Sequence, residues 1–245
     1  MKIAIKKWSI LLFFALIFST LLFFLLQKKP KEFNANRVNL IDNFENNYLF
    51  RGSNPFQNIY GEPEFSYLQI KNAVNQNLRS QNISELEDFY LIVISLLNAD
   101  HYFEIQKERD FFKKYPNIGK VENFSEISPA LLATPFYEYK IAYEITNNYH
   151  LELTKLLTYI NQTLKTKSNK PIVIYVHCNA GRDRTGVISA TYRLLFKNYN
   201  LQQAVNKNIE EVGRNAESLL ESSIISYCFY LKNQKLIGEN FCKKI

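Results

Sequence analysis

The chain has 245 residues and a net charge of +7, and hydrophobic residues make up 47% of it and aromatic residues 15%. This composition excludes a disordered chain, and the length suffices for one domain with a sizeable core. The positive balance suits anionic substrates or anionic lipid, but no stripe of arginine with interleaved aromatics makes nucleic acid an expected partner.

An apolar run of about 19 residues, from Trp8 to Leu26, opens the chain, with lysines on both sides. A run of this length can cross a bilayer as a helix. Leu25-Leu26-Gln27 lacks the small residues of a signal cleavage site, which favours an uncleaved anchor over a cleaved signal. We expect residues 1–31 to be a single-pass membrane anchor with a basic flank, and residues 32–245 to be one domain. The lysines on the two sides of the run are nearly balanced, so the positive-inside rule hardly distinguishes the two orientations. We prefer an extracytoplasmic domain.

Apolar periodicity, turn residues and caps predict the elements of the first half. They are a strand at Tyr48–Phe50, a turn at Arg51–Pro55, a helix at Phe65–Leu78, a short helix capped by Ser84 and Glu87, a buried strand at Tyr90–Leu97 and a helix at Phe103–Tyr115. Residues 116–135 give no clear pattern and are expected to hold surface loops.

The second half continues the alternation of strands and helices. We expect a strand at Tyr137–Ile145, a helix at Tyr149–Lys165, a strand at Pro171–Val176, a helix leading out through Val187–Phe196, and terminal helices at Leu201–Val212 and Glu217–Leu231. Such alternation predicts an α/β fold, with a central, mostly parallel sheet covered by helices on both faces.

The three cysteines, Cys178, Cys228 and Cys242, have no metal-binding spacing and form no evident disulfide framework. A Cys228–Cys242 bridge requires the C-terminal segment to fold back. The plainer interpretation places Cys228 in a helix and Cys242 on a tail.

The most informative stretch is His177–Gly186, where we expect a buried strand to end at Cys178, a short polar loop to follow, and a helix to begin near Arg184 to Gly186. A loop in this position directs backbone N–H groups and a helix N-terminus at one point, which suits an anion. These groups also lower the pKa of a cysteine such as Cys178. Arg184 adds a fork for two phosphate oxygens. A nucleophile under a phosphate-shaped cup predicts phosphoryl transfer to sulfur.

The motif Cys178-x5-Arg184-Thr185-Gly186 resembles the active-site loop of the cysteine-dependent protein tyrosine phosphatases, including the bacterial dual-specificity-like branch. The segment Leu49–Pro55 resembles the region after the first strand in that branch. Within it, Arg51 either faces the phosphate pocket or forms a structural ion pair, which we prefer. The resemblance implies a tyrosine-phosphatase-like fold and a reaction that needs no metal ion or cofactor.

The resemblance also assigns roles to the residues of the loop. Cys178 is expected to be the nucleophile, and Thr185 to stabilise the thiolate as it leaves in the second step. The expected phosphate-binding residues are Asn179, Ala180, Gly181, Arg182, Asp183 and Arg184. His177 is expected to orient the loop through hydrogen bonds.

The general acid is the open point, because the family often takes an aspartate from an upstream loop and residues 146–152 contain none. Glu144, His150 and Glu152 are local substitutes. Asp183 lies within the loop itself, and some bacterial lipid-and-tyrosine phosphatases have a similar Gly-Lys-Asp-Arg-Thr-Gly run in which the aspartate is thought to supply the proton. Asp183 is therefore a candidate acid, or else a brace of the loop.

We expect a phosphatase that acts on phosphomonoesters, with protein phosphotyrosine as the substrate. Phosphoinositide hydrolysis is an alternative, supported by Arg182 beside Asp183, the predicted anchor and the positive charge. A non-catalytic phosphate-binding protein is a second alternative, against which the intact nucleophile argues. A rhodanese-like sulfur transferase fits less well because of the Arg-Thr-Gly ending.

Overall fold

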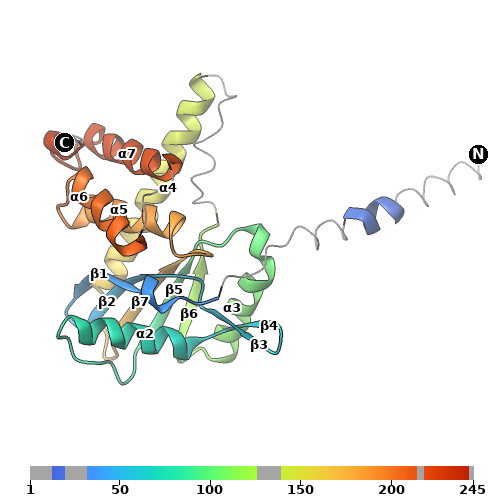
Figure 1. Cartoon of the computed structure of the whole chain (residues 1–245). Coiled ribbons are helices and arrows are strands. Elements are labelled where there is room, and N and C mark those ends of the chain that lie inside the picture. Colours follow the sequence, from blue (N-terminus) through green and yellow to red (C-terminus); the bar gives the residue numbers. More distant parts are fainter. Residues whose placement is uncertain (1–12, 20–31, 126–138, 214–217, 243–245) are drawn as a thin grey trace, which may run out of the picture.

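The computed structural model describes residues 13–19, 32–125, 139–213 and 218–242. A five-stranded sheet in the order β1-β2-β7-β5-β6 forms its centre (Figure 1). β1 is antiparallel to β2, and the other neighbouring pairs are parallel. The strands are β1 (Asn39–Phe44), β2 (Asn47–Gly52), β5 (Tyr90–Ser95), β6 (Gly119–Asn123) and β7 (Ile172–His177).

Helices cover both faces of the sheet (Figure 1). One face carries α2 (Tyr67–Ser80) and α3 (Tyr102–Lys114), and the other carries α4 (Tyr139–Leu164), α5 (Asp183–Phe196), α6 (Leu201–Val212) and α7 (Ser218–Asn233). A hairpin of β3 (Phe56–Ile59) and β4 (Glu62–Phe65) packs on α3, and short 3-10 helices lie at Ala35–Arg37, Ala99–His101 and Glu239–Cys242. The α/β fold expected from the alternating pattern is confirmed.

Alternate side chains of the central strands enter two separate hydrophobic cores. In β7, Ile174 and Val176 belong to the core on the side of α4 and α5, whereas Val173 and Tyr175 belong to the core on the side of α2. Successive side chains of a strand point to opposite faces, so a strand covered on both faces must be apolar throughout. This requirement explains why β5 and β7 are continuous apolar runs in the sequence.

Two predicted elements are wrong. The expected strand at Tyr137–Ile145 is helical from Tyr139 onward as the first turns of α4, and residues 137 and 138 lie outside the described residues. The apolar residues in this stretch recur at i, i+4 into Tyr149 and Leu153, so the helical period continues through it.

The short helix expected at Ser84–Glu87 is absent from this described part of the chain, which is irregular there. The side chain of Asn75 on α2 accepts from the N–H of Leu86 (2.9 Å) and donates to its carbonyl (3.1 Å). The backbone groups that a helix would use are therefore already bonded. Conversely, the pattern gave no signal for β6 or for the β3–β4 hairpin.

The predicted membrane anchor is also wrong. Among residues 13–19, 32–125, 139–213 and 218–242, no helix has the length and apolar character needed to cross a membrane. Residues 13–19 are helical. The rest of the run from Trp8 to Leu26 lies outside the described residues.

The C-terminal segment folds back onto α7. Cys228 on α7 and Cys242 in the last 3-10 helix form a disulfide, and both are buried. The expectation that Cys242 lies on a tail is therefore wrong, and the bridge follows from the return of the chain. Cys178 is the one free cysteine of the three.

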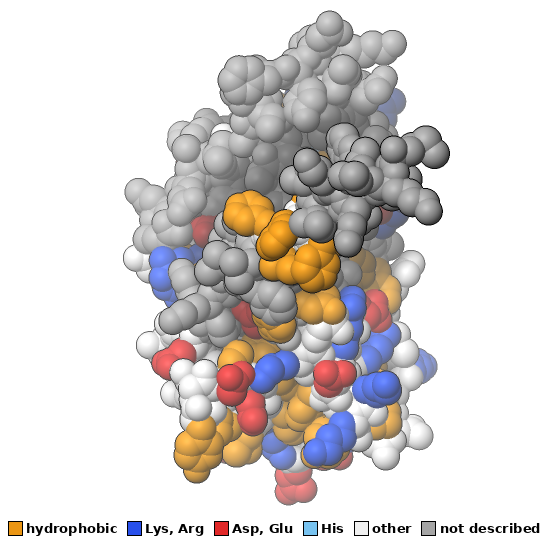
Figure 2. All heavy atoms as spheres, turned by 90° about the vertical axis from the view of Figure 1, so that its right-hand side faces the viewer, with side chains coloured by type: hydrophobic (Ala, Val, Ile, Leu, Met, Phe, Trp, Pro, Cys, Tyr) orange, Lys and Arg blue, Asp and Glu red, His pale blue; other side chains and the backbone are white. Residues whose placement is uncertain are grey.

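Charged side chains of both signs are interspersed on the face seen in Figure 2, which views the molecule from the side of α3 and the hairpin. Lys107 on α3 lies 3.8 Å from Glu62 on β4, one ion pair that contributes to this mixing. The positive excess of the chain is therefore not gathered over the described part of this face.

Candidate active site

Residues 178–184, named the phosphate loop for the role expected of them, comprise the connection after β7 and the first two residues of α5, at the carboxyl edge of the sheet (Figure 1). β7 has a parallel neighbour on each side, β2 and β5. In open α/β sheets, ligands bind beyond the carboxyl ends of the strands. The predicted site residues Cys178 to Arg182 lie in the loop, and Asp183, Arg184 and Thr185 form the first turn of α5.

Gly181 allows the loop to lie directly against the end of β2. Its φ angle is +63°, in the left-handed region, and a Cβ atom there would lie 2.5 Å from the carbonyl oxygen of Gly52 and 2.7 Å from the nitrogen of Ser53. Both observations require glycine. The conformation of the loop is therefore set by contact with the neighbouring strand as well as by its own sequence.

Cys178 lies at the base of the loop with 4% of its surface exposed. Burial by itself raises the pKa of Cys178, but hydrogen bonds from the Thr185 hydroxyl and from the N–H groups of Thr185 and Ala180 lower it, as does the charge of Arg184. The net effect is a pKa below that of an ordinary thiol. The site thus stabilises the thiolate, the reactive form of cysteine.

The segment after β5 holds Arg184 beside the sulfur. Nη1 of Arg184 donates to the carbonyl of Leu96, and the N–H of Leu96 donates to the carbonyl of His177 at 2.9 Å. Leu96, just after the end of β5, thereby links His177, the residue before Cys178, to Arg184.

Of the two alternatives for Arg51, the structure has the one that we preferred, a structural ion pair. Its buried guanidinium donates to Glu211 Oε2 at 2.8 Å, to Asn208 Oδ1 at 2.7 Å and to the carbonyl of Gly181 at 3.0 Å. Glu211 also pairs with Arg193, at 2.5 Å. A buried charge needs such partners, since taking an ion out of water costs several kcal/mol.

His177 points into the interior, and its Nε2 lies 3.0 Å from Oε1 of Glu108 on α3. Both side chains are fully buried. The carboxyl group of Glu108, on a separate element, therefore lies against the ring at the last residue of β7. The expected role of His177 in orienting the loop stays a prediction.

The sequence model of the tyrosine phosphatase family matches residues 73–197, which is 125 of the 245 residues. The matched region includes β5, β7, the phosphate loop and α5. The chain belongs to the tyrosine phosphatase family. The resemblance expected from the loop motif is thus confirmed, and the protein is a hydrolase of the cysteine-based phosphatase superfamily.

Solved phosphatase structures also match this phosphatase, at low identity. The core catalytic domain of the PP-IP phosphatase Siw14 from S. cerevisiae, in complex with citrate, is 17% identical, with a TM-score of 0.41 and coverage of 86% of this chain and 96% of that one. Kinase associated phosphatase with a serine in place of its catalytic cysteine is 10% identical, with a TM-score of 0.46 and coverage of 85% and 97%. No curated protein matches the chain. At these scores, the assignment rests on the family match.

Of the upstream candidates for the general acid, His150 and Glu152 have their contacts away from the loop. His150 is buried between α4 and α7, 3.2 Å from Ser226 Oγ, and burial lowers its pKa to about 4. Glu152 pairs on the surface with Lys155 at 2.7 Å. The side chain of Glu144 lies outside the described part of the chain. Asp183, by contrast, is adjacent in sequence to Arg184 at the start of α5.

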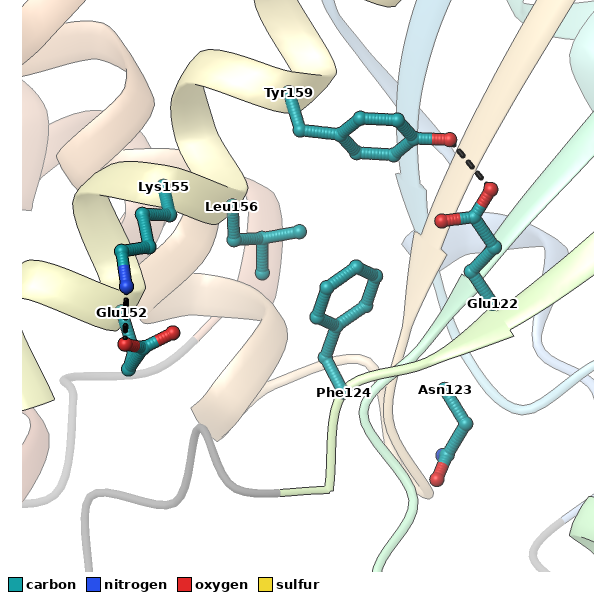
Figure 3. Close-up of a pocket in the computed structure, with 7 residues that line it drawn as sticks. All are labelled: Glu122, Asn123, Phe124, Glu152, Lys155, Leu156 and Tyr159. Carbon is teal, nitrogen blue, oxygen red and sulfur yellow. Dashed lines mark hydrogen bonds and ion pairs between the residues drawn. The ribbon is translucent and has the colours of Figure 1, made fainter.

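A second polar region, the Glu122 pocket, lies at the carboxyl end of β6 beside α4 (Figure 3). Its volume is about 440 Å³, and its lining residues are Glu122, Asn123, Phe124, Glu152, Lys155, Leu156 and Tyr159. The Tyr159 hydroxyl donates to Glu122 at 2.5 Å. The Asn123 amide donates to the carbonyls of Ser95 and Leu97, on either side of the residue that holds Arg184.

Five contributors to the site escaped prediction: Leu96, Glu108, Arg193, Asn208 and Glu211. Leu96 acts through its backbone carbonyl, which carries no residue-specific signal. The others are polar residues on helices, where the bland expectation is a solvated face. Only the tertiary fold reveals that their side chains are buried.

Proposed function

We propose that this phosphatase hydrolyses phosphotyrosine on proteins through a cysteinyl-phosphate intermediate. The observation that carries the proposal is Cys178, a recessed thiol with a lowered pKa, held with Arg184 at the base of the phosphate loop. A recessed nucleophile suits a phosphate on the long, rigid arm of tyrosine better than one on the short arm of serine. The assignment to the tyrosine phosphatase family supports the same substrate.

In the first step of the proposed reaction, the thiolate of Cys178 attacks phosphorus, and an S–P bond forms as the bond from phosphorus to the tyrosyl oxygen breaks. The guanidinium of Arg184 binds two of the non-bridging oxygens, while the loop N–H groups stabilise the charge that develops on them. The leaving oxygen accepts a proton and departs as tyrosine. The lowered pKa of Cys178 supports this step, because it raises the fraction of the reactive thiolate at a given pH.

In the second step, water attacks the phosphorus, and the S–P bond breaks. The electron pair returns to sulfur, and inorganic phosphate leaves. The Thr185 hydroxyl is buried and has no nitrogen or oxygen partner within the described residues, and its hydrogen bond to Cys178 lowers the pKa of the thiol. The same bond stabilises the departing thiolate.

Asp183 is the proposed proton donor. It stands in the first turn of α5, one residue before the phosphate-binding arginine, whereas His150 and Glu152 are occupied elsewhere. In the first step the Asp183 carboxyl gives its proton to the tyrosyl oxygen, and in the second it takes one from the attacking water.

A substrate panel tests the proposed function. We expect the full-length chain to dephosphorylate phosphotyrosyl peptides with a higher kcat/KM than phosphoseryl peptides or short-chain phosphoinositides, all without added metal. Cys178→Ser on the same panel controls for contaminating phosphatases. A preference for phosphoinositides would replace the proposed substrate with the alternative, and turnover equal to that of Cys178→Ser on every substrate would refute catalysis.

A further inference from the structure

We propose that Arg51 is the positioning residue of the phosphate loop: its guanidinium holds the Gly181 carbonyl away from the anion site, so that the next peptide N–H points into it. The inference rests on the proposed phosphatase function and adds a residue outside the Cys-x5-Arg motif. Arg51 is 127 positions before Cys178 in the sequence.

Strand pairing places Arg51 next to the nucleophile. β2 runs parallel to β7, with Arg51 opposite Val176 and Gly52 opposite His177, so β2 ends beside the residue that precedes the loop. The Arg51 side chain is fully buried, and its Nη2 donates to the carbonyl of Gly181 at 3.0 Å. Arg51 therefore contacts the loop on its protein side, away from solvent.

The geometry of the peptide bond converts this contact into an orientation. In a trans peptide the C=O and the following N–H point in opposite directions within one plane. With the carbonyl of Gly181 directed at Arg51, the N–H of Arg182 points the other way, toward the concave side of the loop. A cup of N–H donors requires this orientation, because a carbonyl oxygen directed at phosphate repels it.

This peptide needs an external restraint because it follows a glycine. Gly181 is at φ +63°, and glycine has the widest conformational freedom of any residue. The contact with Gly52 excludes any larger residue, so stiffness cannot come from a side chain at this position. The hydrogen bond from Arg51 restrains this peptide instead.

A buried ion network fixes Arg51 itself. Its Nη1 donates to Asn208 and to Glu211, and Glu211 also accepts from Arg193 at 2.5 and 3.1 Å. Two guanidinium groups thus share one carboxylate, which leaves a positive excess in the interior. Burial lowers the pKa of Arg51, whereas Glu211 and the nearby charge of Cys178 raise it. The thiolate and Arg51 therefore stabilise each other's charge.

Arg51→Lys and Arg193→Lys form a matched pair for the test. Both substitutions replace a buried guanidinium that pairs with Glu211 by an ammonium and so keep the positive charge. Of the two arginines, only Arg51 contacts the loop. Cys178 is the one free thiol, so alkylation by iodoacetamide without added reductant reports on it alone. The measurements are the rate of alkylation against pH, the protection by inorganic phosphate, and the Tm of each variant.

We expect Arg51→Lys to weaken protection by phosphate about tenfold, the loss typical of one hydrogen bond to a charged group, and to move the alkylation midpoint to higher pH. Arg193→Lys should lower the Tm by a similar amount but leave both readouts close to those of wild type. Equal effects of the two variants on protection and midpoint would overturn the proposal, because they would reflect lost stability alone.

Asn208→Ala decides the question if Arg51→Lys does not fold. It removes one acceptor of the Arg51 fork, and we expect protection by phosphate to weaken about threefold; unchanged protection would overturn the proposal. Failure of phosphate to protect the wild-type chain would overturn the proposed function together with this inference. If the same phosphate concentration protects Cys178 from alkylation in wild type and in Arg51→Lys, this inference alone is overturned.

Discussion

Two polar regions lie at the carboxyl edge of the sheet, and they differ in how their charged groups are arranged. At the end of β7, the phosphate loop directs N–H donors and Arg184 toward Cys178, a buried thiol with a lowered pKa. At the end of β6, Glu122 accepts from Tyr159 and Lys120, and the neighbouring Glu152 pairs with Lys155. The first region directs its donors at one sulfur atom, while the second pairs its charged groups with one another.

The difference shows what makes a polar cluster reactive. A carboxylate that already has a phenol and an ammonium as partners has little to gain from a ligand. The donors that converge on the sulfur of Cys178 can make more hydrogen bonds than one thiolate can accept. They are therefore already oriented when a phosphate group binds. Substitutions in the phosphate loop should therefore change chemistry, and substitutions in the Glu122 pocket should change stability.

Cys178→Ser should have the largest effect, because it removes the nucleophile and keeps the donors around it. We expect turnover to fall by several orders of magnitude, as for the loss of other enzyme nucleophiles, while binding of inorganic phosphate persists. Rapid-quench assays and equilibrium binding of phosphate measure the two properties separately. Substantial residual turnover would contradict the cysteinyl-phosphate mechanism.

Asp183→Asn sharpens the comparison by separating proton transfer from binding within the same loop. We expect kcat/KM for a phosphotyrosyl peptide to fall on the order of 10²- to 10⁴-fold, and that for 4-nitrophenyl phosphate far less, because a nitrophenolate leaves without a proton. The controls are His150→Ala and Glu152→Gln, with Tm measured on the same samples. Equal losses on both substrates would make Asp183 a brace of the loop.

Arg184→Lys tests whether the loop needs a fork or only a positive charge. A lysine keeps the charge but cannot bind two phosphate oxygens in parallel, so we expect kcat to fall on the order of 10²- to 10³-fold. Lys155→Arg is the matched exchange in the Glu122 pocket and should leave kcat unchanged. Comparable activity of Arg184→Lys and wild type would show that the geometry of the fork is unimportant.

Thr185→Val should produce a smaller change with a defined sign. The Thr185 hydroxyl lowers the pKa of Cys178, so its removal raises that pKa. Since the reaction needs the thiolate, the acid limb of the kcat/KM profile should move to higher pH. A shift to lower pH, or no shift, would mean that this hydroxyl does not act on the ground-state thiolate.

Tyr159→Phe should have the smallest effect and completes the comparison. It removes the hydroxyl that donates to Glu122, at a cost of about 1 kcal/mol in unfolding free energy, and leaves kcat/KM for 4-nitrophenyl phosphate unchanged. Urea denaturation and steady-state kinetics measure the two effects. A loss of activity without a loss of stability would make the Glu122 pocket part of the substrate site.

The phosphate loop could be predicted from the sequence because its parts are contiguous. One stretch from His177 to Gly186 contains the nucleophile, the arginine and the turn residues, and the buried strands beside it appear as apolar runs. The partner of Arg51 could not be predicted, because Arg51 on β2 and Glu211 on α6 lie 160 positions apart and meet only in the folded chain. A charged residue at each of those positions is ordinary in isolation.

The wrong predictions share a physical cause, which is that a local pattern can satisfy two structures. The apolar residues of Tyr137–Ile145 fit a strand when read alone, and a helix when read together with Leu153. Ser84 and Glu87 have the spacing of a cap, but Asn75 binds the backbone between them. The length and apolar character of Trp8–Leu26 predicted an anchor that the described helices do not support.

The pairing of Cys228 with Cys242 has a consequence for the fate of the nucleophile. A thiolate of lowered pKa is also the form that peroxide oxidises to sulfenic acid, and many such cysteines are rescued by a second thiol nearby. Here the other two cysteines are joined to each other, so the chain contains no second thiol for Cys178. Recovery from oxidation by disulfide formation must therefore use a thiol from another molecule.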